Sequence, residues 1–198
     1  MVHERFTSFL RRRYNRRMGV SVNIENMTRQ ARDDDKGTAW VVMGVSGCGK
    51  SSIGAQLALA LGVPFIEGDA FHSPANIAKM TAGAALTDDD RHDWLLTLRD
   101  QLAAREGGVV LSCSSLKRAY RDLLRSAGGD VRFAHLAGER ALLLERVSNR
   151  PGHYMPPSLL DSQLSTLEPL QPDEAGITLD IRDTPERLVA QILASVGR

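Results

Sequence analysis

The stretch "GVSGCGKSS", Gly44–Ser52, decides the fold of this chain. It follows the apolar run "AWVVM" and precedes "IGAQLALALG", so it stands between an expected strand and an expected helix. Gly49, Lys50 and Ser51 complete the pattern G-x-x-x-x-G-K-[ST]. Glycines let such a loop curl until successive backbone N–H groups point inward, and the following helix N-terminus adds partial positive charge. The stretch therefore predicts a phosphate-binding loop.

The loop is expected to bind ATP together with Mg²⁺. Lys50 is expected to reach the β- and γ-phosphates as a catalytic residue, and the Ser51 hydroxyl to coordinate the metal. The alternative is a glycine-rich turn with a surface lysine. Cys48 is expected to be a small side chain that fits the loop, not a redox switch. The residues expected to bind ATP are Gly44, Val45, Ser46, Gly47, Cys48, Gly49, Lys50, Ser51 and Ser52.

From Thr38 onward, short apolar runs alternate with helical runs. The five expected strands are "TAWVVMGV", "VPFIEGD", "GVVLSCS", "DVRFAHLAG" and "GITLDIR". Strands that alternate with helices form right-handed βαβ units and a parallel sheet. Residues 38–198 are therefore predicted to be one α/β domain of the P-loop NTPase fold, with a five-stranded parallel sheet and helices on both faces. We expect it to resemble nucleoside monophosphate kinases, with a small lid at about residues 149–166.

Residues 1–37 differ from this pattern. They contain the basic segment "FLRRRYNRRMG" and the polar segment "RQARDDDKG", without sustained apolar periodicity. We expect a mostly disordered extension. A solvated tail, a true start at Met18 or Met27, and an organelle transit peptide remain open explanations.

Composition narrows the possible partners. The net charge of +1 gives no global field for nucleic acid or for an anionic membrane. No apolar run reaches the roughly 18 residues of a membrane span. The chain has two cysteines, Cys48 and Cys113, whose spacing suggests no zinc site, so a reduced cytoplasmic protein is expected.

The choice of acceptor depends on where an acidic residue follows a strand. No N-K-x-D motif of a regulatory GTPase is present, and "GVVLSC" continues into Ser114 without an acid. Asp69 instead ends "PFIEGD". Because the carboxyl ends of parallel strands gather beside the phosphate-binding loop, Asp69 is expected to lie near both Mg²⁺ and an incoming hydroxyl. This placement favours a kinase.

The segment "GDAFHSPANIAKMTAGAALTDDDRHDWL", residues 68–95, resembles the acceptor motif of the gluconokinases. In that family G-D-x-x-H-x-x-x-N-I-x-K-M is followed by G-x-x-L-x-D-x-D-R-x-x-W-L. "CSSLKRAYRDLLR", residues 113–125, is similar to a second family motif, with Ser115 in place of the usual alanine. "RVSNRPGHYMPPSLLDSQLSTLEP", residues 146–169, resembles the family's lid. The resemblance runs from Ala39 to the C-terminus.

The resemblance implies ATP-dependent phosphorylation of D-gluconate to 6-phospho-D-gluconate, which feeds the pentose phosphate or Entner-Doudoroff routes. Asp69 would then act on the acceptor hydroxyl and the metal, and Arg150 at the start of the lid would balance phosphoryl charge. Arg91 is expected to hold the gluconate carboxylate, because an arginine binds a carboxylate through two hydrogen bonds. The remaining residues expected to bind gluconate are His72, Asn76, Ser114, Ser115 and His153.

Some alternatives stay open at this stage. Arg91 could instead neutralise the acids at residues 88–90 on a helix face. The enzyme could be another small-molecule kinase of this fold, such as a shikimate or nucleoside monophosphate kinase. A nucleotide-binding module without phosphotransfer is the alternative from another class, and a homodimer is possible because the family often forms one.

Overall fold

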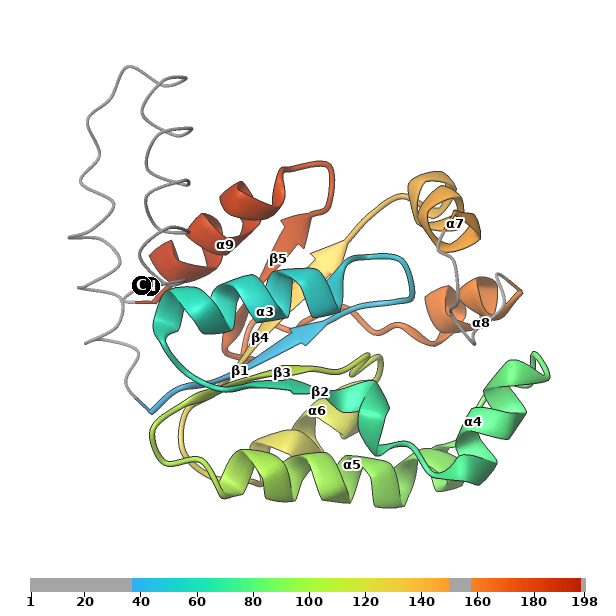
Figure 1. Cartoon of the computed structure of the whole chain (residues 1–198), viewed down its shortest axis with the longest axis horizontal. Helices are drawn as coiled ribbons and strands as arrows, with labels where there is room; N and C mark the ends of the chain where they lie inside the picture. Colours follow the sequence, from blue (N-terminus) through green and yellow to red (C-terminus); the bar gives the residue numbers. More distant parts are fainter. Residues whose placement is uncertain (1–36, 150–157, 197–198) are drawn as a thin grey trace, which may run out of the picture.

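The computed structural model of the chain describes residues 37–149 and 158–196 (Figure 1). The expected extension at residues 1–37 lies almost wholly outside the described residues, as do Arg150 and His153. The strands are β1 Ala39–Met43, β2 Phe65–Glu67, β3 Val109–Ser112, β4 Val131–Ala137 and β5 Gly176–Asp180. The helices are α3 Lys50–Leu61, α4 Pro74–Thr81, α5 Asp88–Ala103, α6 Arg118–Arg125, α7 Arg140–Ser148, α8 Leu159–Thr166 and α9 Pro185–Ala194.

The five strands form one sheet in the order β2-β3-β1-β4-β5, and every neighbouring pair is parallel. This confirms the predicted alternation. β1 lies at the centre, and the chain leaves it toward β2 on one side before it returns to β4 on the other. In open α/β sheets, ligands bind outside the carboxyl ends of strands where the strand order reverses. The loop that follows β1 lies at this position.

Two hydrophobic cores lie on opposite faces of the sheet. Helices α3 and α9 cover one face, and α5 and α6 cover the other (Figure 1). Strand β1 serves both cores because its side chains alternate: Trp40 and Val42 belong to the first, and Val41 and Met43 to the second. All five residues of β1 are buried, as expected for a strand covered on both faces.

Helix boundaries follow the local signals in the sequence. Ser73 caps α4 by accepting a hydrogen bond from the Asn76 N–H, and Pro74 occupies the first turn. Thr87 and Asp90 form a reciprocal capping box at the start of α5. α3 ends at Gly62, which adopts a left-handed conformation.

No helix in the described ranges is both long enough and apolar enough to span a membrane.

His135 is a buried titratable residue in β4 that pairs with Met43 of β1 and does not line the cleft described below. Neither of its ring nitrogens has a hydrogen-bond partner among the described residues. Burial lowers the pKa of His135 from 6.5 to about 4, and the charge of Arg121 acts in the same direction. The unfolded chain therefore takes up this proton more readily than the folded protein does. The neutral His135 therefore lets the folded protein keep its full free energy of unfolding above pH 6.5. That free energy decreases as the pH falls from 6.5 toward 4.

His135→Leu should flatten the dependence of stability on pH. The free energy of unfolding, measured with urea at intervals between pH 6.5 and 4, should fall less steeply than in the wild type. His92→Leu, which alters an exposed histidine of α5, should keep the wild-type slope. Equal slopes in the wild type and His135→Leu would show that His135 does not control this pH dependence.

Candidate active site

The phosphate-binding loop connects β1 to α3 in the predicted place. Gly47 has a φ of 81°, and a Cβ there would lie 2.9 Å from the Leu143 carbonyl oxygen, so only glycine fits without strain. The Lys50 ammonium donates to the Val45 carbonyl oxygen at 3.1 Å and so lies across the loop. No side chain caps the start of α3. The N-terminal N–H groups of this helix can therefore serve an anion.

Cys48 is buried inside this loop and is a free cysteine. Burial raises the pKa of its thiol, and the nearby Lys50 charge offsets this only in part. A thiol held in its neutral form is a poor nucleophile. These properties agree with the expectation that Cys48 is a small side chain that fits the loop.

A cleft extends from the phosphate-binding loop along the carboxyl ends of the strands. It brings together six of the predicted site residues: Ser46, Lys50, Asp69, His72, Arg91 and Ser114. The other residues that line it are Met80, Ala85, Leu86, Asp88, Leu116, Lys117, Tyr120, Leu159, Ser162, Gln163 and Thr166. Polar groups thus face the cleft both from the phosphate-binding loop and from Asp69, His72 and Arg91 on the expected acceptor side.

Asp69 lies in a short 3₁₀ turn, Gly68–Phe71, that directly follows β2. A Cβ at Gly68 would lie only 2.2 Å from the Ser112 carbonyl oxygen, so the turn packs tightly against β3. The Trp94 indole N–H donates to the Gly68 carbonyl oxygen at 2.8 Å and ties the turn to α5. Backbone contacts on two sides therefore fix the place of the Asp69 carboxylate in the cleft.

The His72 ring stacks on Trp94 with a centroid distance of 4.2 Å and an interplanar angle of 16°. Burial lowers the pKa of His72, while the neighbouring Asp69 carboxylate acts in the opposite direction. His72 is therefore a neutral imidazole near pH 7. Its Nδ1 is buried without a hydrogen-bond partner among the described residues. A neutral ring in this position can exchange hydrogen bonds with a hydroxyl.

Three cations lie near the acceptor side of the cleft, and their partners differ. Lys117 binds both oxygens of Asp88 at 2.7 Å. Lys79 pairs with Asp90 at 2.6 Å and does not line the cleft. The Arg91 guanidinium lies 5.9 Å from the Tyr120 ring centroid and, within residues 37–149 and 158–196, has no ion pair. Of these three cations, Arg91 is thus the one that lines the cleft without an ion pair among the described residues.

Comparison with known proteins agrees with this geometry. The family model for shikimate kinase matches residues 46–196. A gluconokinase of Gluconobacter oxydans is 45% identical over 157 residues, covering 77% of this chain and 88% of that protein. The chain belongs to the gluconokinase family. The crystal structure of a gluconokinase from Sinorhizobium meliloti is 48% identical, with a TM-score of 0.75 over 82% of this chain and 93% of that one.

A second solved structure extends the likeness within the family. An unliganded sugar kinase from Janibacter sp. is 48% identical, with a TM-score of 0.77 over 81% of this chain and 95% of that chain. The predicted P-loop kinase fold is therefore confirmed by both the sheet and the comparisons.

Two predicted substrate ligands of the gluconokinase motifs do not line the cleft. The Asn76 side-chain amide donates to the Asp90 carbonyl oxygen at 2.6 Å, so it joins α4 to α5. Ser115 is fully buried and has a φ of 46°. Ser51 and Ser52 lie in the first turn of α3, where the Ser52 hydroxyl accepts a hydrogen bond from Gln56. The roles predicted for these residues stay predictions.

Helix α8 supplies cleft residues that sequence reasoning missed. Ser162, Gln163 and Thr166 all line the cleft. The Gln163 side-chain oxygen accepts a hydrogen bond from the Ser46 N–H at 2.7 Å, across 117 residues of sequence. The four-residue spacing of Ser162 and Thr166 places two hydroxyls on one helical face, which was the available signal. Their partner segment could not be inferred from that spacing.

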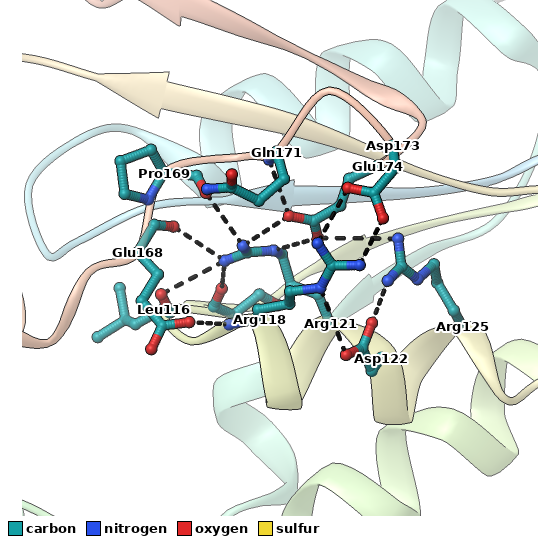
Figure 2. A network of polar contacts seen from close by, with 11 residues as sticks. Leu116, Arg118, Arg121, Asp122, Arg125, Glu168, Pro169, Gln171, Asp173 and Glu174 are labelled. Atoms are coloured by element: carbon teal, nitrogen blue, oxygen red, sulfur yellow. Dashed lines mark hydrogen bonds and ion pairs between the residues drawn. The ribbon is translucent and has the colours of Figure 1, made fainter.

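Arg121 of the second gluconokinase motif is fully buried at the centre of a network of polar contacts, called here the junction (Figure 2). It donates to both carboxylate oxygens of Glu174, at 2.6 and 2.8 Å. It also donates to the carbonyl oxygens of Ser115, Glu168 and Pro169 at 3.0–3.3 Å. The junction therefore joins the segment after β3 to the segment after α8.

Arg121→Lys should lower the free energy of unfolding by about 2 kcal/mol, the scale of losing hydrogen bonds to a buried charged group. An ammonium cannot span both Glu174 oxygens and the backbone carbonyls as the planar guanidinium does. Arg118→Lys is the matched control, because Arg118 of the same helix pairs with Asp173 while partly exposed. Its effect in urea denaturation should be much smaller. Similar losses in both variants would argue against the junction.

Proposed function

We propose that this protein transfers the γ-phosphoryl group of ATP to the primary hydroxyl of D-gluconate, giving 6-phospho-D-gluconate and ADP. The family to which the chain belongs supports this substrate. The observation that carries the proposal is one cleft lined by Lys50 of the phosphate-binding loop, by Asp69 and by Arg91, whose guanidinium has no acidic partner in the described ranges. A phosphate end, a reacting centre and a carboxylate end thus share one cleft.

The phosphate-binding loop holds the nucleotide in this proposal. Its backbone N–H groups bind the β-phosphate, and Lys50 moves from the Val45 carbonyl to the β- and γ-phosphates. The Ser51 hydroxyl and the Asp69 carboxylate fit Mg²⁺, which prefers oxygen ligands and keeps several waters and phosphate oxygens. The metal ion, when bound, would neutralise charge on the phosphates. Arg150 is proposed to add positive charge from the lid.

Asp69 acts on the reacting hydroxyl in this proposal. Its carboxylate orients the O–H of gluconate toward the γ-phosphorus and accepts the proton as the new P–O bond forms. The bond from the γ-phosphorus to the bridging oxygen of ATP breaks, and ADP leaves. Because the turn that carries Asp69 is fixed by β3 and α5, the carboxylate needs little reorganisation.

The other end of gluconate needs a cation and small polar partners. Arg91 is proposed to bind the carboxylate, while His72 and Ser114 bind hydroxyls along the polyol chain. Asn76 supports this arrangement by fixing the backbone of Asp90, next to Arg91. Ser115 and His153 remain proposed ligands from the family motifs.

Two further expectations are part of the proposal. A cytoplasmic location is favoured because the two cysteines are unpaired and buried, as in a reducing compartment. A homodimer is proposed from the family resemblance alone.

A coupled assay of ADP release tests the proposed function. Purified protein with ATP and Mg²⁺ should turn over rapidly with gluconate, slowly with shikimate or AMP, and only at a trace rate with water. Faster turnover with shikimate or AMP would show another acceptor. Nucleotide binding without ADP release for any acceptor would favour the non-catalytic module.

A further inference from the structure

Helix α8 contacts both ends of the cleft. Ser162 and Thr166, one turn apart, line the acceptor side together with Asp69 and Arg91. At the start of the helix, Leu159 packs with Met80 of α4 and with Leu86, which precedes α5. An acceptor in the cleft would therefore touch α8 itself and the segments that α8 packs against.

The same helix reaches the phosphate-binding loop. Gln163, between the two cleft hydroxyls in sequence, accepts the Ser46 N–H at 2.7 Å. Ser46 directly precedes Gly47, where a Cβ would lie 2.8 Å from the Val147 side chain and 2.9 Å from the Leu143 carbonyl oxygen. The hydrogen bond therefore acts on the N-terminal half of the loop. The N–H groups expected to bind a phosphate follow it in sequence.

The far end of α8 is held by the buried junction of Arg121. Its guanidinium binds the carbonyl oxygens of Glu168 and Pro169, which directly follow the helix (Figure 2). The Glu168 N–H also donates to the Leu116 carbonyl oxygen at 2.8 Å. Because the C-terminal end of α8 is held in place, a ligand that contacts its cleft face can shift the helix only by pivoting it about that end.

We propose that Gln163 is a positioning residue that couples gluconate binding to the phosphate-binding loop. Gluconate that rests against Ser162 and Thr166 fixes α8, and Gln163 then holds the Ser46 amide in the conformation that receives the nucleotide. The inference rests on the proposed function, since gluconate is the ligand that it names. Coupling of this kind is reciprocal, so each ligand strengthens the binding of the other by the same factor.

Calorimetric titration of a non-hydrolysable ATP analogue with Mg²⁺, with and without saturating gluconate, measures the coupling. In the wild type, gluconate should tighten binding of the analogue by about fivefold or more. Gln163→Met keeps the shape but removes the acceptor, and Gln163→Asn is too short to reach Ser46. In both variants, the ratio of the affinity for the analogue with gluconate to that without gluconate should fall to near one.

Gln163→Glu separates the hydrogen bond from charge. Its carboxylate still accepts the Ser46 N–H, so gluconate should tighten binding of the analogue by the wild-type factor. The added negative charge should weaken binding of the analogue both with and without gluconate. Gln191→Met is the matched control. It also removes a side-chain hydrogen bond, from Gln191 of α9 to Asp183, and neither residue lines the cleft. It should keep both the wild-type affinity and the wild-type ratio.

The outcomes distinguish the two levels of the proposal. A wild type that phosphorylates gluconate but shows a ratio of one, or a Gln163→Met that keeps the wild-type ratio, overturns the role of Gln163 alone. A wild type that neither binds nor phosphorylates gluconate overturns the proposed function, and the coupling with it.

Discussion

Asp69→Asn should lower kcat for gluconate phosphorylation by about a hundredfold or more, the usual scale for a positioned acid–base group. The substitution keeps the shape of the side chain and removes its charge. Because Asp69 is proposed to act on the hydroxyl as the P–O bond forms, its contribution is greatest in the transition state. The KM for gluconate should therefore change much less than kcat. Steady-state kinetics with gluconate and ATP varied separately gives both values.

Asp93→Asn is the matched control for this charge change. Asp93 is an exposed acid of α5 that does not line the cleft, so its removal should leave kcat near the wild-type value. A kcat for Asp69→Asn within a fewfold of the wild type would contradict the proposed role. A large increase in KM with an unchanged kcat would instead make Asp69 a substrate-binding residue only.

Arg91→Ala should raise the KM for gluconate by an amount equivalent to about 2–4 kcal/mol, the cost of leaving a buried carboxylate without its charged partner. The interaction is present in both the ground state and the transition state, so kcat and the KM for ATP should change little. Arg91→Lys should restore the wild-type KM for gluconate only poorly, because the point charge of an ammonium does not replace the planar guanidinium. Arg99→Ala, further along α5, removes a like side chain outside the cleft and should have little effect.

A neutral polyol such as sorbitol tests the same claim from the side of the ligand. It should be a poor substrate for the wild type, and the gap between gluconate and sorbitol should shrink in Arg91→Ala. An unchanged preference for the acid would mean that Arg91 does not bind the carboxylate. Lys117 would then be the next candidate, since Lys79 lies outside the cleft.

The parts of this site that the sequence predicted correctly depend on local rules. The loop at Gly44–Ser52 needs glycines and a helix start in consecutive residues, so its pattern is complete in one short stretch. The position of Asp69 in the cleft followed from the strand that it follows, because parallel strands bring their carboxyl ends to one edge of the sheet.

The missed parts depend on contacts between distant segments. The bond from Ser46 to Gln163 spans 117 residues, and the pair of Arg121 and Glu174 spans 53. No local pattern states which distant group a buried side chain will meet. The hydrogen bond from the Asn76 amide to the Asp90 carbonyl oxygen, which joins α4 to α5, was likewise not indicated by a local pattern.

One competition experiment tests the central claim most directly. The protein is given equal concentrations of gluconate, shikimate and AMP with ATP and Mg²⁺, and the products are followed by phosphorus NMR. Because competing substrates are consumed in the ratio of their kcat/KM values, the product distribution reports specificity in a single reaction. The account predicts that 6-phosphogluconate, with its phosphorus coupled to the two protons on C6, forms far ahead of any other phosphorylated product. Predominant formation of shikimate phosphate, consumption of AMP ahead of 6-phosphogluconate formation, or a gluconate phosphate attached at another carbon would contradict it.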